Sequence, residues 1–164
     1  MPRTTLLRDL AALALAAVLW WADAVGPRAP GPRSLLVATG AGVSAGVVGF
    51  LLHEWGHLAA ALAAGSHVHY PDRLLAPLLF HFDTARNDRR QFLWMSYGGY
   101  AASAVGVALI ACLAPLDRWS GQLALGLAGL GMVVTLIAEL PTTVRVARGA
   151  PLPTGYAFVP PPPS

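Results

Sequence analysis

The stretch that decides the fold is LLVATGAGVSAGVVGFLLHEWGHLAAALAA, residues 35–64. It contains one acidic residue and no arginine or lysine, and as a helix it extends about 45 Å, enough to cross a bilayer with tilt. Gly42 and Gly46 are four residues apart, a spacing that favours close helix packing in lipid. His53, Glu54 and His57 stand near its end. Ionisable groups in a membrane span are costly, so we expect them to be functional.

The composition also indicates a membrane protein. Of 164 residues, 55% are hydrophobic and only 12% are charged, about half the charged share of a typical soluble domain. The mean hydropathy is +0.56. These values exclude an intrinsically disordered chain and argue against a soluble enzyme. The net charge is +3, but the arginines are scattered and are not interleaved with aromatic residues, so no nucleic-acid partner is expected.

Three further apolar runs are expected to be helical, at residues 10–22, 92–114 and 121–146. The first is short for a span and follows two arginines, so residues 1–25 are interpreted as an N-terminal transmembrane helix or a signal-like segment. Residues 35–148 are expected to form a membrane-embedded, metalloprotease-like core. Residues 149–164 are rich in proline, and we expect an extended tail without a core of its own.

We therefore predict an all-α integral membrane protein with about four transmembrane helices. Its three-helix core bears the HExxH helix, and an irregular or re-entrant loop is expected at residues 65–88. With four spans, the N-terminus, the loop and the C-terminal segment share one side, which carries eight of the eleven arginines. Because positive charge accumulates on the cytoplasmic side, both termini are expected there. The Arg-only basic composition is typical of a GC-rich bacterial genome, so the bacterial inner membrane is the expected location.

The pattern His53-Glu54-Trp55-Gly56-His57 is an H-E-x-x-H motif. On a helix, residues i and i+4 lie on one face, so both imidazoles can bind one metal ion. The adjacent Glu54 can then act as the general base on a metal-bound water. Neutral imidazoles suit zinc, and three protein ligands with one open position are typical of catalytic sites. One Zn²⁺ per chain is therefore expected.

Depth in the bilayer selects the third ligand. The second and fourth spans run in the same direction. His53 lies 18 residues after Leu35, and Glu139 lies 18 residues after Gly121. Both are therefore about 27 Å along their spans. Glu139 is the first choice for the third ligand. Asp83, in a loop that could fold back into the membrane, is the alternative.

The third span places small residues at a similar depth. Gly98 and Gly99 lie within about 14 Å of its cytoplasmic start. They are expected to permit close helix contact, and they are also candidates for binding a substrate backbone. Asn87 or Asp88 is expected to be the N-cap of this span.

On these motifs the chain resembles the site-2 protease family of intramembrane zinc metalloproteases. The resemblance rests on the HExxH motif in a span, the following Leu58-Ala59-Ala60-Ala61, and the small-residue segment Tyr97-Gly98-Gly99-Tyr100-Ala101-Ala102. It implies a three-span core with zinc held by His53 and His57 and with Glu54 as the base. The family takes its third ligand from an Asp-Gly motif, which this sequence lacks. Pro153-Thr154-Gly155 has threonine where the aspartate would be.

The leading hypothesis is an intramembrane zinc metallopeptidase that hydrolyses peptide bonds of membrane-associated substrates near the cytoplasmic face, with Glu54 as general base on zinc-bound water. Two alternatives stay open. One is a catalytically inactive metal-binding or helix-binding relative that acts as a membrane regulator. The other is a His-box membrane oxidoreductase with iron. The expected partners are the lipid bilayer and a membrane-protein substrate or partner helix. The sequence leaves the oligomeric state open.

Overall fold

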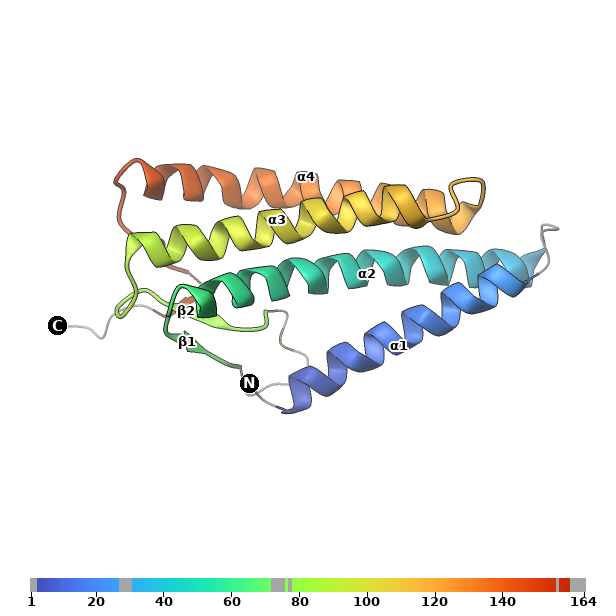
Figure 1. Ribbon diagram of the computed structural model, residues 1–164, viewed down its shortest axis with the longest axis horizontal. Coiled ribbons are helices and arrows are strands. Elements are labelled where there is room, and N and C mark those ends of the chain that lie inside the picture. The colour runs from blue at the N-terminus through green and yellow to red at the C-terminus, as the bar shows by residue number, and fades with distance from the viewer. Residues whose placement is uncertain (1–2, 27–30, 72–75, 77, 156, 160–164) are drawn as a thin grey trace.

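The structure of the chain is a computed structural model that describes residues 3–26, 31–71, 76, 78–155 and 157–159. In this part of the chain, four long helices run alongside one another, and a small sheet closes one end (Figure 1). The helices are α1 (Arg3–Val25), α2 (Pro32–Ala63), α3 (Arg89–Leu113) and α4 (Trp119–Ala147). The strands are β1 (Val68–His69), β2 (His81–Asp83) and β3 (Phe158–Val159).

All four helices are long and apolar enough to cross a membrane. Large apolar side chains point outward from each of them, including Leu7, Leu36, Leu113 and Ile137. Such wide apolar exposure is unfavourable in water and suits lipid. The prediction of an integral membrane protein with four helices is therefore confirmed.

The helix ends follow from local sequence. Asp88 caps α3, because its side chain accepts a hydrogen bond from the Gln91 backbone N–H at 2.8 Å. The Gln91 side chain in turn accepts from the Asp88 N–H at 2.8 Å, which completes a capping box. At the end of α2, Gly65 has a φ of 71°, the left-handed conformation that commonly ends a helix. The predicted N-cap at Asn87 or Asp88 is thus confirmed at Asp88.

The first helix extends beyond the apolar run at residues 10–22, stays within the predicted segment 1–25, and is connected to the core at both ends. Asp9 is buried and accepts a hydrogen bond at 2.9 Å from the Trp55 indole N–H of α2. Asp23 accepts one at 2.7 Å from the Ser120 hydroxyl at the start of α4. The polar turn before residue 10, which the apolar run did not include, is therefore part of α1 and helps to fix it to the HExxH helix.

Helices α2 and α3 make their closest approach through glycines. A Cβ added to Gly56 would lie 2.6 Å from the Gly98 carbonyl oxygen, and a Cβ on Gly98 would collide with Ala60. Only glycine allows the two backbones to lie this close. The contact brings backbone carbonyls of α3 beside the motif histidines.

The small sheet has the order β1-β2-β3, with β1 antiparallel to β2 and β2 parallel to β3. The largely buried apolar core lies beneath it and includes Leu58, Leu79, Phe82, Phe92 and Val146. The all-α prediction is correct for the four helices but misses this sheet. It lies partly within residues 65–88, where an irregular or re-entrant loop was expected; entry of that loop into the bilayer stays a prediction.

The C-terminal segment takes part in the fold. Residues 149–164 were expected to form an extended tail without a core of its own, and no contact with the rest of the chain was predicted. Instead, the Phe82 N–H donates to the Ala157 carbonyl at 3.0 Å, and Phe158 packs against the buried core. The proline run itself, residues 160–163, lies outside the described residues. The segment turns back because Gly149 and Gly155 adopt positive φ angles of 106° and 141°.

The antiparallel helices place the N-terminal end of α1, the segment between α2 and α3, and the C-terminal segment at the same end of the molecule (Figure 1). The count of eight arginines on one side assumed that these three segments lie together, as they do here. The cytoplasmic identity of that end belongs to the proposal below.

Replacing Gly98 with leucine should separate α2 from α3. We expect the free energy of unfolding to fall by about 1–3 kcal/mol or more, the usual range for overpacking. Unfolding of the detergent-solubilised protein, followed by circular dichroism, measures this change. Gly129→Leu is the matched control, because a Cβ at Gly129 meets nothing within 4 Å. Equal losses in the two variants would contradict the close contact.

Candidate metal centre

His53 and His57 lie one turn apart on the same face of α2, and both are buried. Their ring centroids are 4.3 Å apart with the planes nearly perpendicular. Their Nε2 atoms are 3.0 Å apart. The HExxH spacing thus brings the two imidazoles to one point, as the sequence predicted.

Helix α3 sets the orientation of both rings. His53 Nδ1 lies 3.1 Å from the Gly99 carbonyl oxygen and 2.9 Å from the Ser103 hydroxyl. His57 Nδ1 lies 2.9 Å from the Met95 carbonyl oxygen. A carbonyl oxygen can only accept, so each Nδ1 carries a hydrogen, and in the neutral imidazole each Nε2 keeps its lone pair. Metal-ligating histidines are commonly held in this way.

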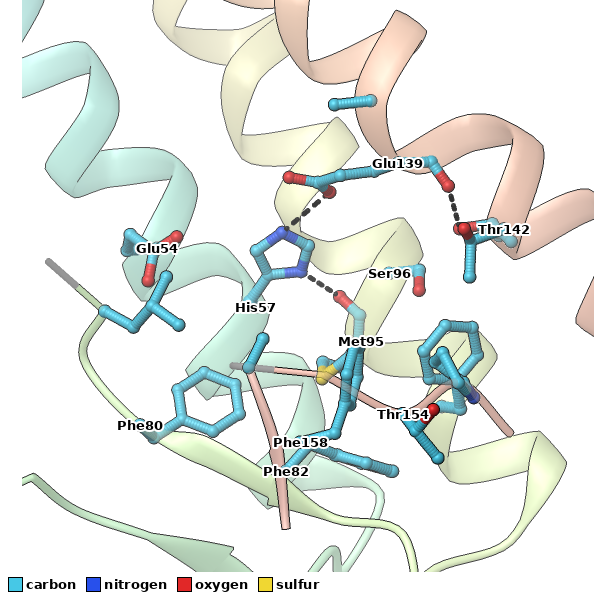
Figure 2. Close-up of a pocket in the computed structure, with 16 residues that line it drawn as sticks. Glu54, His57, Phe80, Phe82, Met95, Ser96, Glu139, Thr142, Thr154 and Phe158 are labelled. Carbon is cyan, nitrogen blue, oxygen red and sulfur yellow. Dashed lines mark hydrogen bonds and ion pairs between the residues drawn. The ribbon is translucent and has the colours of Figure 1, made fainter. Parts of the chain in front are cut away.

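Glu139 of α4 completes the group. Its Oε1 lies 3.2 Å from His53 Nε2, and its Oε2 lies 3.3 Å from His57 Nε2. Figure 2 shows His57 between the Glu139 carboxylate and the Met95 carbonyl. Two lone pairs and a carboxylate that converge without a cation would repel one another. Ligands bound tetrahedrally to zinc at about 2.0–2.1 Å are about 3.3–3.4 Å apart, so the three residues fit a metal ion.

The position of Glu139 follows from the fourth helix. Its backbone carbonyl accepts a hydrogen bond from the Thr143 hydroxyl at 3.2 Å, and that hydroxyl lies 2.7 Å from the Tyr100 hydroxyl of α3. His53 and Glu139 were predicted to lie at the same depth, and in the structure their side chains contact each other. The Glu139 side chain remains 39% exposed, so the centre is accessible from outside the bundle.

Glu54 lies beside this group without belonging to it. The residue is only 7% exposed. Its Oε2 accepts a hydrogen bond from the Leu79 backbone N–H at 3.2 Å, so the segment before β2 orients the carboxylate. Among the described residues, Oε1 has no hydrogen-bond partner. One oxygen of the carboxylate is held, and the other is free to exchange a proton.

Asp83, the alternative third ligand, is engaged elsewhere. Its Oδ2 lies 2.9 Å from Nε2 of His69 on β1, and its Oδ1 accepts from the backbone N–H groups of Ala85 and Arg86 at 3.0 and 3.1 Å. The three-residue group that can hold a metal contains Glu139 and not Asp83. The hydrogen bond from His69 and those from the two backbone amides hold the pKa of the Asp83 carboxyl below its usual range.

Gly98 and Gly99 have the packing role that the sequence predicted, and their role in binding a substrate backbone stays a prediction. Gly98 lies against Gly56 and Ala60, and a Cβ on Gly99 would collide with the His57 ring. Neither glycine lines the two cavities beside the metal group. Gly99 instead leaves the space that the His57 imidazole needs.

The first cavity lies at the sheet end of the metal group and has a volume of about 280 Å³. Glu54, His57 and Glu139 line it together with aromatic residues of the sheet region (Figure 2). The C-terminal segment supplies part of its wall through Pro153, Thr154, Ala157 and Phe158. Sequence reasoning missed this contribution; an apolar Phe158-Val159 pair before the proline run was the one available signal.

The second cavity, about 320 Å³, lies on the other side of the metal group between α2, α3 and α4. Glu54 and Glu139 line both cavities, so the metal group lies between them.

No protein-family model, no curated protein and no solved structure matches this chain. The site's assignment therefore depends on the motif and on the geometry of the residues themselves.

Replacing Glu139 with alanine should remove a direct metal ligand. We expect metal affinity to fall by at least about 100-fold, since even losing a residue that orients a ligand costs 10–100-fold. Elemental analysis of protein purified without chelators measures this. Asp83→Ala is the control and should keep close to one metal ion per chain. Normal metal content in Glu139→Ala, with loss in Asp83→Ala, would transfer the ligand role to Asp83.

The lowered pKa of Asp83 predicts a pH dependence of stability. An unfolded aspartate titrates near about pH 3.9. The ionised Asp83 therefore stabilises the fold fully above that pH, and this contribution is lost as the pH falls through its lower folded-state pKa. Thermal unfolding at pH 6 and pH 3 should show a smaller acid-induced loss in Asp83→Asn than in the wild type. Asp117→Asn, in the exposed turn before α4, should behave as the wild type does. An equal acid-induced loss in all three proteins would contradict the assignment.

Proposed function

We propose that this protein is an intramembrane zinc metallopeptidase that hydrolyses peptide bonds of membrane-associated substrates near the cytoplasmic face. The observation that carries the proposal is the position of Glu54. Its carboxylate is buried, adjoins the group of His53, His57 and Glu139, and keeps one oxygen unengaged among the described residues. This is the arrangement that a general base requires. The resemblance to the site-2 protease family supports the same function.

The donor set suits zinc. Two neutral imidazole nitrogens and one carboxylate are a common ligand set of zinc peptidases, and three protein ligands leave one coordination position open. When bound, zinc supplies Lewis-acid chemistry: it polarises a carbonyl group and lowers the pKa of water towards about 7.

Glu54 moves the proton. Its Oε2 is fixed by the Leu79 N–H, while Oε1 accepts the proton of the attacking water. The same oxygen then donates that proton to the amine nitrogen that leaves when the peptide bond breaks. His53 and His57 would act as ligands through Nε2, while their Nδ1 atoms are held by carbonyl groups of α3.

The location follows from the arginine distribution. The end of the molecule that carries the sheet and both terminal segments has most of the arginines, which favours the cytoplasmic side. We infer a bacterial inner-membrane protein with cytoplasmic termini. Water would have to reach the metal group from the side on which Glu139 is partly exposed.

One observation favours a second candidate, a non-catalytic relative that binds metal or a partner helix. Thr154 stands where the family has its aspartate ligand, and it lines the sheet-end cavity. A threonine there leaves the third ligand to Glu139. Iron-dependent oxidation has less support, since the described residues contain one group of this kind, and a di-iron enzyme needs more ligands than it offers.

The test is Glu54→Gln in the full chain, reconstituted with single-span membrane substrates. We expect cleavage to fall by at least about 1,000-fold, since general base catalysis typically contributes 10²–10⁴-fold, while bound zinc stays equal to wild type. Glu139→Gln should lose both the cleavage activity and the bound zinc. Undiminished cleavage by Glu54→Gln would contradict its role as base. A zinc-loaded wild type that cleaves none of a broad substrate panel would favour the non-catalytic relative, and iron as the bound metal would favour the oxidoreductase.

A further inference from the structure

The second cavity lies between α2, α3 and α4 and opens to the outside of the bundle, where Phe50 and Val134 of its wall are exposed. Its wall is made largely of small or apolar residues. Gly46, Gly49, Gly106 and Gly131 contribute to its wall from three helices. At one end it reaches Glu54 and the metal group. The cavity is therefore continuous with the place where a peptide bond would be cleaved.

Its shape comes from the divergence of α2 and α4. A Cβ added to Gly42 would lie 2.8 Å from Leu123 Cβ, and one added to Gly46 would lie 3.3 Å from Leu127 Cβ. At Gly49, one to two turns further on, an added Cβ meets nothing within 4 Å. The two helices are thus in contact towards the start of α2 and separate towards the metal group.

Two glycines of the wall have no packing role. An added Cβ at Gly49 of α2 or at Gly131 of α4 meets nothing within 4 Å. Glycine in a helix interior costs about 1 kcal/mol relative to alanine, and at these positions no close contact offsets that cost. Both glycines line this cavity, and Gly49 also lines a further cavity between α1, α2 and α3.

A second observation points to a ligand. Glu54 is more than nine-tenths buried and lines this cavity, and among the described residues its Oε1 has no hydrogen-bond partner. The Ser103 hydroxyl, another polar group of the wall, is already engaged by His53. Most of the remaining wall is apolar, with Phe50, Leu127 and Met132 among its side chains. A peptide bond at the metal would meet the Glu54 carboxylate. An apolar side chain that extends from that peptide would match the wall.

The volume limits what can enter. At about 320 Å³ the cavity is at the small end of ligand pockets. One bulky apolar side chain fits within this volume.

We propose that this cavity is a substrate subsite that takes one bulky apolar side chain next to the cleaved bond, and that Gly49 and Gly131 set its size limit. This inference rests on the proposed peptidase function and adds a side-chain preference to it. Both positions line the cavity and have room for an added Cβ, so we expect a larger residue at either to reduce the space for the substrate side chain.

The test uses peptide hydroxamates, which bind zinc directly and need no turnover. The zinc-loaded full chain in detergent is titrated with hydroxamates whose side chain beside the metal-binding group grows from alanine to leucine to phenylalanine. We expect wild type to bind the leucine or phenylalanine compound at least about tenfold more tightly than the alanine compound, as apolar pockets discriminate by 10–200-fold. Gly131→Leu and Gly49→Leu should abolish or reverse this preference while the alanine compound binds as before.

Gly126→Leu and Gly129→Leu are matched controls. Both glycines lie on α4, an added Cβ at either meets nothing within 4 Å, and neither lines the cavity. Both controls should keep the wild-type preference. Equal affinity for all compounds in wild type, or an unchanged preference in Gly49→Leu and Gly131→Leu, would overturn the subsite and leave the metal site standing. Failure of the zinc-loaded wild type to bind any hydroxamate would overturn the proposed function, and the subsite with it.

Discussion

The Nε2 atoms of His53 and His57 lie 3.0 Å apart because carbonyl groups of α3 hold both Nδ1 atoms. This arrangement demands a close backbone approach between α2 and α3, which glycines such as Gly98 provide. It also creates two buried lone pairs that need a positive partner. A metal ion shared with Glu139 would meet that need, and the packing of the three core helices would then hold these donors together.

A cluster of ionisable side chains is energetically costly inside a membrane, so neighbouring groups have to supply hydrogen bonds to it. The Ser103 hydroxyl shares His53 Nδ1, and the Leu79 amide binds Glu54. At the sheet end, β3 near the C-terminus pairs with β2, and Phe158 of β3 forms part of the wall of the first cavity. Helix α1 contributes from the other side through the hydrogen bond of Asp9 with Trp55, a residue inside the HExxH motif. Segments far apart in the sequence therefore all contribute contacts around one site.

Much of this could be predicted from the sequence, since helix periodicity is local. The i and i+4 spacing placed His53 and His57 on one face, and the rise per residue placed Glu139 at their level. What could not be predicted depends on long-range contacts. The pairing of Asp83 with His69 removed it from the ligand set, and the parallel strand at Phe158 gave the tail a role. The cavity between α2 and α4 depends on how far two helices diverge, which the positions of glycines in a sequence do not fix.

The central claim is that His53, His57 and Glu139 bind one zinc ion with a position left open. X-ray absorption at the zinc edge of the purified, detergent-solubilised chain tests this most directly. We expect one zinc ion per chain, with two imidazole nitrogens and one or two oxygens at about 2.0–2.2 Å, and loss of the imidazole signal in the His53→Ala/His57→Ala double variant. A chain that binds no metal, or whose metal environment is unchanged in that double variant, would contradict the claim.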